Sequence, residues 1–508
     1  MFNLDTLSYF RYLMKPIFSL LILLLCSFCA QGQKVFDFNA TCVQSFQEIL
    51  QLKIKSGKTL ALKAKQLNQE NLIPLFLESH ADFYLLFLNE SSTDYDLLFP
   101  IFQERLNSIE EGNRSSPFYL FALATIRLQR ALVSVKFGHT WDAAWDFRKA
   151  YLLLKENKKK FPNFSPNELM YGSLEALIGT VPKGYKWLAN ILGMQGSITN
   201  GMKRVNLFCN SSDPWAKLFF NQAAFIYPYL LYLIENKKED ALAFVQQKKL
   251  DIVNNHLHAF MAANLALSNK QNELSKSIIL NRNKSDEYLT MSVWDYQLGF
   301  IKLYHLEYKE AKNHFELYTQ NFKGNFYIKD VFQKISWIDY LQGNLKSAEE
   351  ARKQVLKKGS AQSDADKQAF KDAKNNYWPN PLLLKARLLN DGGYHLEAFK
   401  LLAGKSTNDF EKIDDKLEFA YRAARIYDDL GKSDEAIKNY WVAIKIGQNR
   451  SAYFAARSAL QIGQIYEQRG QIKLAITFYQ KCLDMEDHEY KNSIDQKAKA
   501  GIARCKGE

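Results

Sequence analysis

The histidines, the residues best suited to metal binding or proton transfer, are scattered along the sequence. His256 and His258 lie two residues apart. On a helix this spacing turns the two rings about 200° from one another, so they could not share a metal ion. His305 and His314 fall on successive predicted helices. We interpret them as packed or exposed side chains rather than as ligands.

The acidic residues do not form a general acid–base pair either. Asp414 with Asp415, and Asp428 with Asp429, are adjacent in sequence at predicted helix ends or turns, where solvation explains them. The sequence contains no H-E-x-x-H motif, no Walker phosphate loop and no G-x-S-x-G turn. We therefore predict no catalytic residues, no metal ligands and no cofactor.

A segment near the N-terminus predicts export. From Met14 the sequence reads MKPIFSLLILLLCSFCAQGQ, in which a lysine precedes a run of apolar residues. The small residues Ala30 and Gly32 then precede Gln33 with the spacing of a cleavage site. We predict that residues 1–32 are a secretory signal peptide, that translation starts at Met14, and that the mature protein is in the periplasm or cell envelope.

Two alternatives for this segment stay open. A membrane anchor would need roughly 18 to 20 apolar residues, and the run from 16 to 30 is shorter. A lipoprotein would attach its lipid at Cys29, but Phe28 stands where a small residue is wanted. Cleavage is the interpretation that we prefer.

The composition predicts a large folded protein. The chain has 508 residues, of which 47% are hydrophobic and 14% aromatic, so it can form several domains or one elongated array. The net charge of +13 is spread over the whole length, which indicates a lysine-rich solvated surface rather than a nucleic-acid site.

The cysteines do not predict a disulfide framework. Cys42, Cys209, Cys482 and Cys505 remain after cleavage. On antiparallel helices, the closest pair in sequence, Cys482 and Cys505, would lie roughly 15 Å apart, and a bridge requires about 7 Å or less. We expect free and mostly buried thiols.

Two C-terminal segments, 419–446 and 456–485, repeat one pattern of small and aromatic residues with an offset of 463 − 424 = 39 residues. The superposed pairs are Ala424 with Gly463, Tyr427 with Tyr466, Gly431 with Gly470, Ala436 with Ala475, Tyr440 with Tyr479, and Ala443 with Cys482. Small residues allow two antiparallel helices to approach closely. We expect Gly431 to end the first helix in a left-handed conformation, and Ser433 to cap the second.

This pattern resembles the tetratricopeptide repeat, a helix-turn-helix unit of 34 residues. The resemblance implies an all-α fold, an α-solenoid of TPR-like hairpins in a right-handed superhelix. Weaker copies upstream place alanines where Ala436 stands: Ala311, Ala348 and Ala398. The interval from 348 to 398 is longer than the others, and we interpret its polar stretch as a helix extension and a loop ending at Pro379 and Pro381.

The predicted domains are an N-terminal helical region with a degenerate repeat (33–160), a helical insertion broken by glycine and proline (161–235), and the repeat array (236–508). Within the insertion, 171–208 should form short helices and turns. The apolar run 215–234 should form a buried pair of helices broken at Pro228.

The resemblance also implies a function. In this fold the first helix of each unit lines the concave surface, and residues left over after the packing positions are assigned become candidates for binding. They are Tyr421, Arg425, Asp428, Arg457, Gln464 and Glu467. Tyr and Arg are frequent binding hot spots. An alternative for Arg425 and Asp428 is that they pair with each other along one helix.

The subclass of these repeats that clamps a C-terminal carboxylate needs lysines and asparagines that are absent at the corresponding positions, among them Tyr421, Arg425, Arg457, Leu460 and Gln461. The leading hypothesis is a non-enzymatic scaffold of the bacterial envelope that binds a protein or peptide. The chain also resembles secreted repeat proteins of Gram-negative bacteria of the Bacteroidota type. The alternative is an envelope carrier or membrane-associated module for an apolar ligand or lipid, and an enzyme comes third.

Overall fold

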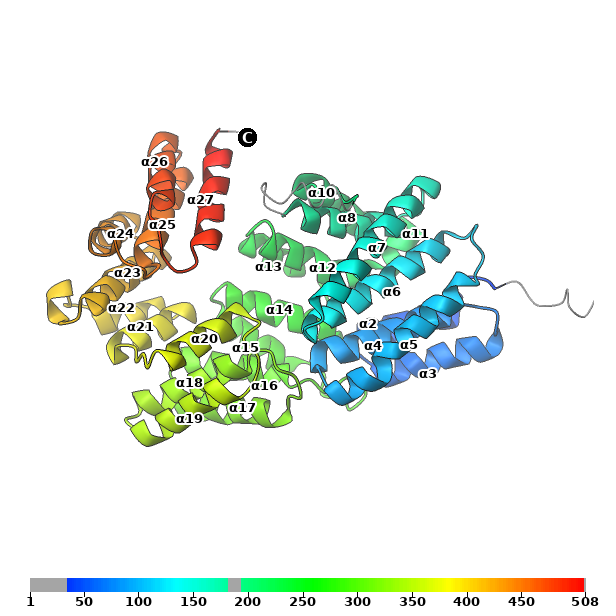
Figure 1. Cartoon of the computed structure of the whole chain (residues 1–508), viewed down its shortest axis with the longest axis horizontal. Helices are drawn as coiled ribbons and strands as arrows, with labels where there is room; N and C mark the ends of the chain where they lie inside the picture. Colours follow the sequence, from blue (N-terminus) through cyan, green and yellow to red (C-terminus); the bar gives the residue numbers. More distant parts are fainter. Residues whose placement is uncertain (1–33, 181–192, 507–508) are drawn as a thin grey trace, which may run out of the picture. The chain divides into compact units, whose positions relative to one another are not determined.

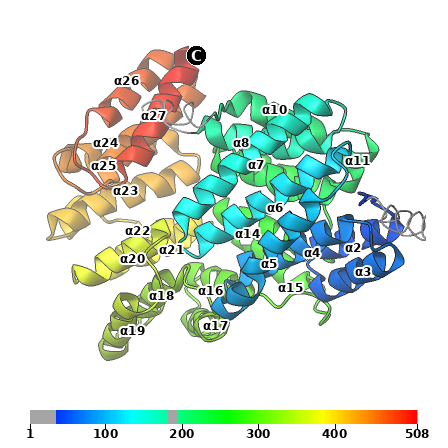
Figure 2. The ribbon, with the colours of Figure 1, turned by 45° about the vertical axis from the view of Figure 1, so that its right-hand side comes forward.

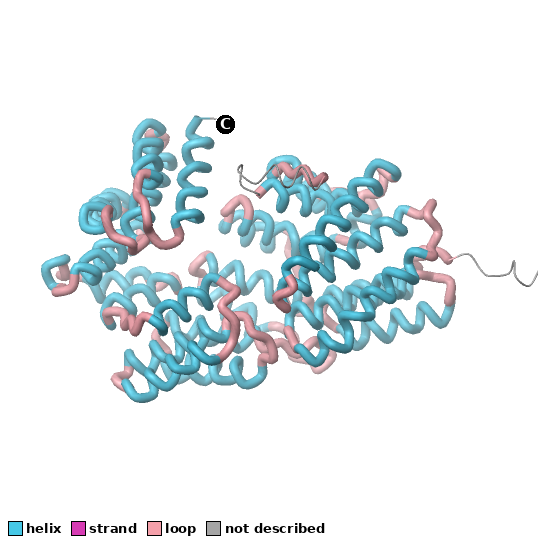
Figure 3. The backbone as a smooth tube through the Cα atoms, in the orientation of Figure 1, coloured by secondary structure: helices cyan, strands magenta, loops and turns pink. Residues whose placement is uncertain are grey.

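The computed structural model describes residues 34–180 and 193–506, which fold almost entirely into helices (Figure 3). Across these ranges the β-type pairing consists of one isolated bridge between Val35 and Asn71. The prediction of an all-α fold is therefore confirmed. The predicted signal peptide, with Cys29 and the cleavage position before Gln33, lies outside the described residues.

Residue contacts divide the chain into two compact units. Unit 1 contains the described residues up to 237, together with 254–258 and 284–290, and unit 2 contains 238–253, 259–283 and the described residues from 291. The helices of both units are labelled in Figure 1. The three-part division predicted from the sequence stays a prediction.

Unit 1 is built around aromatic side chains. Phe46, Phe121 and Phe219 are buried, and the ring centroids of Phe46 and Phe219 are 5.0 Å apart. The helices of this unit are α2 (Ala40–Leu50), α3 (Ile54–Leu67), α4 (Ile73–Asn89), α5 (Ser92–Glu110), α6 (Pro117–Lys136), α7 (Thr140–Lys160), α8 (Pro166–Gly179), α10 (Ile198–Cys209), α11 (Pro214–Leu218) and α12 (Phe220–Leu233).

Helix α6 is long and apolar enough to cross a membrane, and it is the one such helix in the part of the chain that the structure describes. Its 18-residue apolar window has a mean hydropathy of 1.3, and 72% of that window is buried inside the fold. Because α6 packs against α4, α5 and α7, its hydrophobicity is that of a core helix.

The predicted break at Pro228 is wrong. Pro228 lies inside α12, and the two helices of this region separate at Phe219 instead. An internal proline costs one backbone hydrogen bond and introduces a steric clash. The packing of Ala223, Ala224 and Leu230 in the core outweighs that cost.

Unit 2 consists mainly of antiparallel helical hairpins, several of which are seen side by side in Figure 2. Its helices are α13 (Lys238–Gln247), α14 (His256–Ser268, most of which belongs to this unit), α15 (Asn272–Asn281), α16 (Val293–Tyr304), α17 (Tyr308–Asn321), α18 (Ile328–Leu341), α19 (Leu345–Lys357), α20 (Asp364–Lys374), α21 (Pro381–Asp391), α22 (His395–Leu402), α23 (Ile413–Asp429), α24 (Ser433–Gly447), α25 (Phe454–Gln468), α26 (Ile472–Leu483) and α27 (Lys491–Lys506), with a short 3₁₀ helix η2 (Thr407–Asp409).

The predicted packing positions are confirmed. Each second helix, α17, α19, α22, α24 and α26, carries its alanine with no exposed surface; these are Ala311, Ala348, Ala398, Ala436 and Ala475. A methyl group at this position lets the second helix approach the first closely. In the last hairpin the facing residue is Gly463, where an added Cβ would lie 2.7 Å from the ring of Tyr479.

The long interval between Ala348 and Ala398 contains a complete additional helix, so the predicted extension and loop are a correction. Helix α20 begins after Ser363, whose side chain caps it by accepting a hydrogen bond from the backbone N–H of Asp366. It packs against α18 and α19 and buries Ala369.

Glycine closes the best hairpins as predicted, but the expected cap is absent. Gly431 and Gly470 have φ angles of +73° and +70°, a conformation in which a Cβ would be strained. Helix α24 begins at Ser433 itself, and Lys432 occupies the N-cap without a side-chain hydrogen bond.

No disulfide joins Cys482 and Cys505. Cys482 is buried and Cys505 is partly exposed, and both are thiols. Burial raises the pKa of the Cys482 thiol to about 12. The prediction of unbridged cysteines is confirmed for this pair.

Candidate functional site

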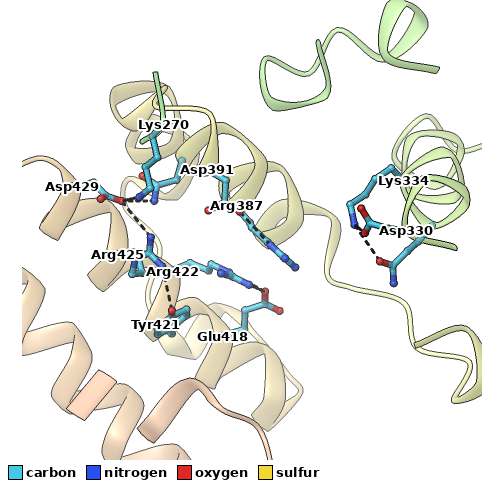
Figure 4. Close-up of polar contacts among 12 residues, drawn as sticks. Lys270, Asp330, Lys334, Arg387, Asp391, Glu418, Tyr421, Arg422, Arg425 and Asp429 are labelled. Atoms are coloured by element: carbon cyan, nitrogen blue, oxygen red, sulfur yellow. Dashed lines mark hydrogen bonds and ion pairs between the residues drawn. The ribbon is translucent and has the colours of Figure 1, made fainter. Parts of the chain in front are cut away.

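The charged residues of unit 2 gather on the face formed by its successive first helices. We call this the first-helix face, and it comprises residues of α21, α23, α25 and α27, which pack in that order. Figure 4 shows its central part. The cations that the structure adds to the predicted candidates are Lys270, Arg387, Arg422 and Lys497.

One ion pair occurs on two successive helices in equivalent positions. Arg387 Nε lies 3.5 Å from Asp391 Oδ2 on α21, and Arg425 Nη2 lies 4.0 Å from Asp429 Oδ2 on α23. Both pairs are four residues apart, and the helices repeat here with an offset of 425 − 387 = 38 residues. The repeat therefore builds a periodic row of arginines and carboxylates.

Asp429 also holds groups from outside its own helix. It forms an ion pair with Lys270 of the α14–α15 turn, and Asn390 Nδ2 donates to Asp429 Oδ2 over 2.7 Å. Burial would raise the pKa of Asp429, but Lys270 and Arg425 together lower it. This carboxylate is thus committed to cross-linking three helical elements of unit 2.

Arg422 is held by its own helix. Its Nε and Nη2 atoms donate to Glu418 Oε1 over 3.1 and 2.9 Å, and both side chains are 8% exposed. A buried charge left without its partner typically costs about 3–5 kcal/mol. We therefore interpret Glu418 and Arg422 as a pair that maintains the fold.

The structure corrects the expectation that Tyr421 is a surface residue. Tyr421 is 2% exposed, and its hydroxyl accepts a hydrogen bond from Arg425 Nη1 over 3.3 Å. Burial would raise its pKa, yet the guanidinium groups of Arg425, Arg457 and Arg422 lower it overall. Tyr421 therefore has almost no surface to offer a partner, but it reports a strongly positive potential on the first-helix face.

Asp428 and Glu467 have equivalent structural roles. Tyr440 Oη donates to Asp428 Oδ2 over 3.0 Å, and the corresponding Tyr479 hydroxyl donates to Glu467 in the next hairpin. Arg504 of α27 also donates to both carboxylate oxygens of Glu467, over 2.8 and 2.9 Å. These contacts join the two helices of a hairpin, and the second carboxylate joins the following helix.

The alternative pairing of Arg425 with Asp428 is also wrong. Residues three and four positions ahead can both face Arg425, and the guanidinium pairs with Asp429. Asp428 instead accepts from Tyr440, and burial raises its pKa. The sequence alone could not choose between the two aspartates because the choice depends on the second helix.

Two predicted candidates stay available. Arg457 and Gln464, both on α25, are partly exposed, and among the described residues neither makes a side-chain hydrogen bond or ion pair. Arg457 occupies the position of Glu418 one repeat earlier, since 457 − 418 = 39. The carboxylate that neutralises Arg422 in α23 is thus replaced by a cation in α25.

The histidines considered for metal binding have separate partners. His305 Nδ1 lies 3.0 Å from Glu307 Oε1, and His314 Nδ1 lies 2.8 Å from Asp295 Oδ1. Within the described ranges no group of three or more histidine, cysteine, aspartate or glutamate side chains could hold a metal ion.

Two pockets in unit 2 are too narrow for a small organic ligand. The larger holds about 10 Å³, roughly one water molecule, between Trp337, Arg352 and Trp378. The other is lined by Arg387, Arg422 and other residues of α21 and α23. Ligand pockets usually measure about 300–1,000 Å³. The first-helix face is therefore better suited to a polypeptide that lies across it.

Comparison with known proteins identifies the repeats. Residues 417–446 and 456–488 match the tetratricopeptide repeat family. The chain contains tetratricopeptide repeats. The two matched segments cover the hairpins α23–α24 and α25–α26. Tetratricopeptide repeats are typically non-enzymatic scaffolds, and their presence supports a role in protein–protein interaction.

Two solved structures of repeat proteins are also similar to the chain. The crystal structure of the APC/C hetero-tetramer Cut9–Hcn1 has 12% identity and a TM-score of 0.27, with 89% of this chain and 95% of that chain covered. The crystal structure of yeast Tom70 has 15% identity and a TM-score of 0.25, with 92% and 96% covered. No curated protein sequence matches the chain. The assignment to the family therefore rests on the two matched repeats.

Proposed function

We propose that the first-helix face of unit 2 binds a protein or peptide partner, and that the chain acts as a non-enzymatic scaffold in the cell envelope of a Gram-negative bacterium. The observation that carries the proposal is the row of charged side chains on α21, α23 and α25, held in place by contacts within and between the repeats. Side chains fixed before binding lose little conformational entropy when a partner arrives.

The proposal can be tested by photo-crosslinking in cells. A photoreactive amino acid replaces Gln464, which is partly exposed on the first helix α25 and has no side-chain partner in the described structure. The matched control places the same amino acid at Leu474, which is 44% exposed on the second helix α26. Crosslinked products are identified by mass spectrometry.

We expect Gln464 to capture a discrete protein that Leu474 does not capture. Equal labelling from both positions would contradict a specific binding face. Lipid rather than protein at Gln464 would favour the alternative function, an envelope carrier or membrane-associated module.

The envelope location is a separate proposal, supported by the sequence of residues 14–33. N-terminal sequencing of the mature protein should give a chain that begins at or near Gln33. Recovery from the cytosol of a chain that begins at Met1 or Met14 would contradict export.

A further inference from the structure

The first-helix face changes its charge balance between α23 and the C-terminus. On α23 each arginine has a carboxylate: Arg422 has Glu418, and Arg425 has Asp429. On α25 the corresponding position is Arg457, and in the part of the chain that the structure describes no carboxylate lies within ion-pair distance of it. The C-terminal end of the face therefore has cations in excess.

Helix α27 adds a second cation to this end. It packs directly on α25, with Ile494, Ala498 and Gly501 buried in the shared core. Arg504 of α27 pairs with Glu467 near the C-terminal ends of both helices, which fixes their parallel alignment. Lys497 lies about two turns before Arg504, on the part of α27 beside the start of α25.

Arg457 and Lys497 act on one another electrostatically. Burial, Arg457 of α25 and Lys238 at the start of α13 all lower the pKa of Lys497, to about 8. Lys497 is partly exposed and has no ion pair among the described residues. The nearest carboxylate on the same helix, Asp495, is paired with Lys491 over 3.2 Å.

Cations that repel one another at a partly desolvated position raise the energy of the unbound state. An anion placed between them removes the repulsion and gains charge-assisted hydrogen bonds. We propose that Arg457 and Lys497 form a binding site for the side-chain carboxylates of an acidic segment in a protein partner. This rests on the proposed function, because it names the chemistry of the partner that the first-helix face binds.

The charge pattern argues for carboxylates spread along a segment. The excess cations lie on two successive helices, Arg457 on α25 and Lys497 on α27, and not in one closed pocket. A segment crossing the parallel first helices would meet them in turn. Lys270 and Arg425 at the α23 end share the single carboxylate of Asp429, so the segment would meet cationic groups there also.

The site can be tested with the full purified mature chain and a fluorescently labelled hexaglutamate peptide. We expect the wild-type chain to bind the peptide, and the double variant Arg457→Gln, Lys497→Gln to bind about three- to tenfold more weakly. Hexaglutamine should not bind. Added salt should weaken the wild-type interaction, because screening acts on partly exposed charges.

Lys499→Gln is the matched control, since it removes the same charge from an exposed position of the same helix. It should change the affinity by less than about twofold. Arg457→Lys keeps the charge and should restore most of the binding. Amide exchange in α25 and α27 verifies that each variant is folded.

Three results would overturn the inference: no binding of hexaglutamate, equal losses in the double variant and in Lys499→Gln, or stronger binding of free inorganic phosphate than of the peptide at the same residues. The crosslinking at Gln464 does not depend on any of these results. A discrete protein captured there with no hexaglutamate binding would leave the scaffold proposal standing and the acidic partner rejected.

Discussion

Replacing Tyr421 with alanine should destabilise the C-terminal repeats rather than remove a binding contact. Tyr421 is 2% exposed, and its ring centroid lies 5.0 Å from that of Phe454 and 6.3 Å from that of Tyr440. Alanine would leave a cavity among these rings. Truncation of a large buried aromatic side chain to alanine costs about 3–5 kcal/mol.

A second variant separates the ring from its hydroxyl. Tyr421→Phe keeps the packing and removes the hydrogen bond of 3.3 Å from Arg425. Such a bond contributes about 0.5–1.5 kcal/mol. Most of the loss in the alanine variant should therefore come from packing.

Hydrogen exchange of the full chain measures these costs locally, which matters because repeat proteins open in parts. Amides of α23 to α25 should exchange about 10²- to 10³-fold faster in Tyr421→Ala, at about 1.4 kcal/mol for each factor of ten. Leu474→Ala, at a side chain 44% exposed on α26, is the control and should change the opening free energy by at most about 0.5 kcal/mol. Unchanged exchange in Tyr421→Ala, combined with loss of the partner, would refute the assignment of this residue to the core.

Three further outcomes can be measured on the same chain. Ala436→Leu should cost about 1–3 kcal/mol, because Ala436 has no exposed surface and a larger side chain overpacks the hairpin; an unchanged melting midpoint would count against the repeat register. Gly463→Ala should cost a similar amount, about 1–3 kcal/mol, since its Cβ would lie 2.7 Å from the ring of Tyr479, and denaturation by urea would reveal it. Burial and two neighbouring cations lower the pKa of Lys497 to about 8, against about 10.4 in an unfolded chain, so the unfolded state binds more protons between these values. The stability of α27 should therefore rise from about pH 8 toward pH 9.5, and Lys497→Met should abolish the rise in its amide protection.

The binding candidates show where sequence reasoning failed. Tyr421 was assigned to the surface because the register identifies which face of α23 meets α24, but α25 covers a further part of that helix. Asp428 and Glu467 were assigned to a partner, although tyrosines of the second helices hold them. Each error comes from contacts between helices that are distant in sequence.

Other features could have been found in the sequence. Arg387 stands 38 residues before Arg425, which is the spacing of the alanines in the same two hairpins, so the repeat itself carries this signal. Lys497 gave no such signal, because α27 lies beyond the last matched repeat.

The sequence by itself determined the all-α class, the hairpin repeat, the closing glycines and the buried alanines from Ala311 to Ala475. These follow from local rules, because a small residue at a fixed spacing and a glycine with positive φ have the same effect in every unit. Only the tertiary structure decided that α20 is a separate helix, which aspartate Arg425 binds, and which cations of the first-helix face have no carboxylate. Those outcomes depend on the neighbours that stacking brings to each side chain, and stacking places together residues that lie 39 or more positions apart in the chain.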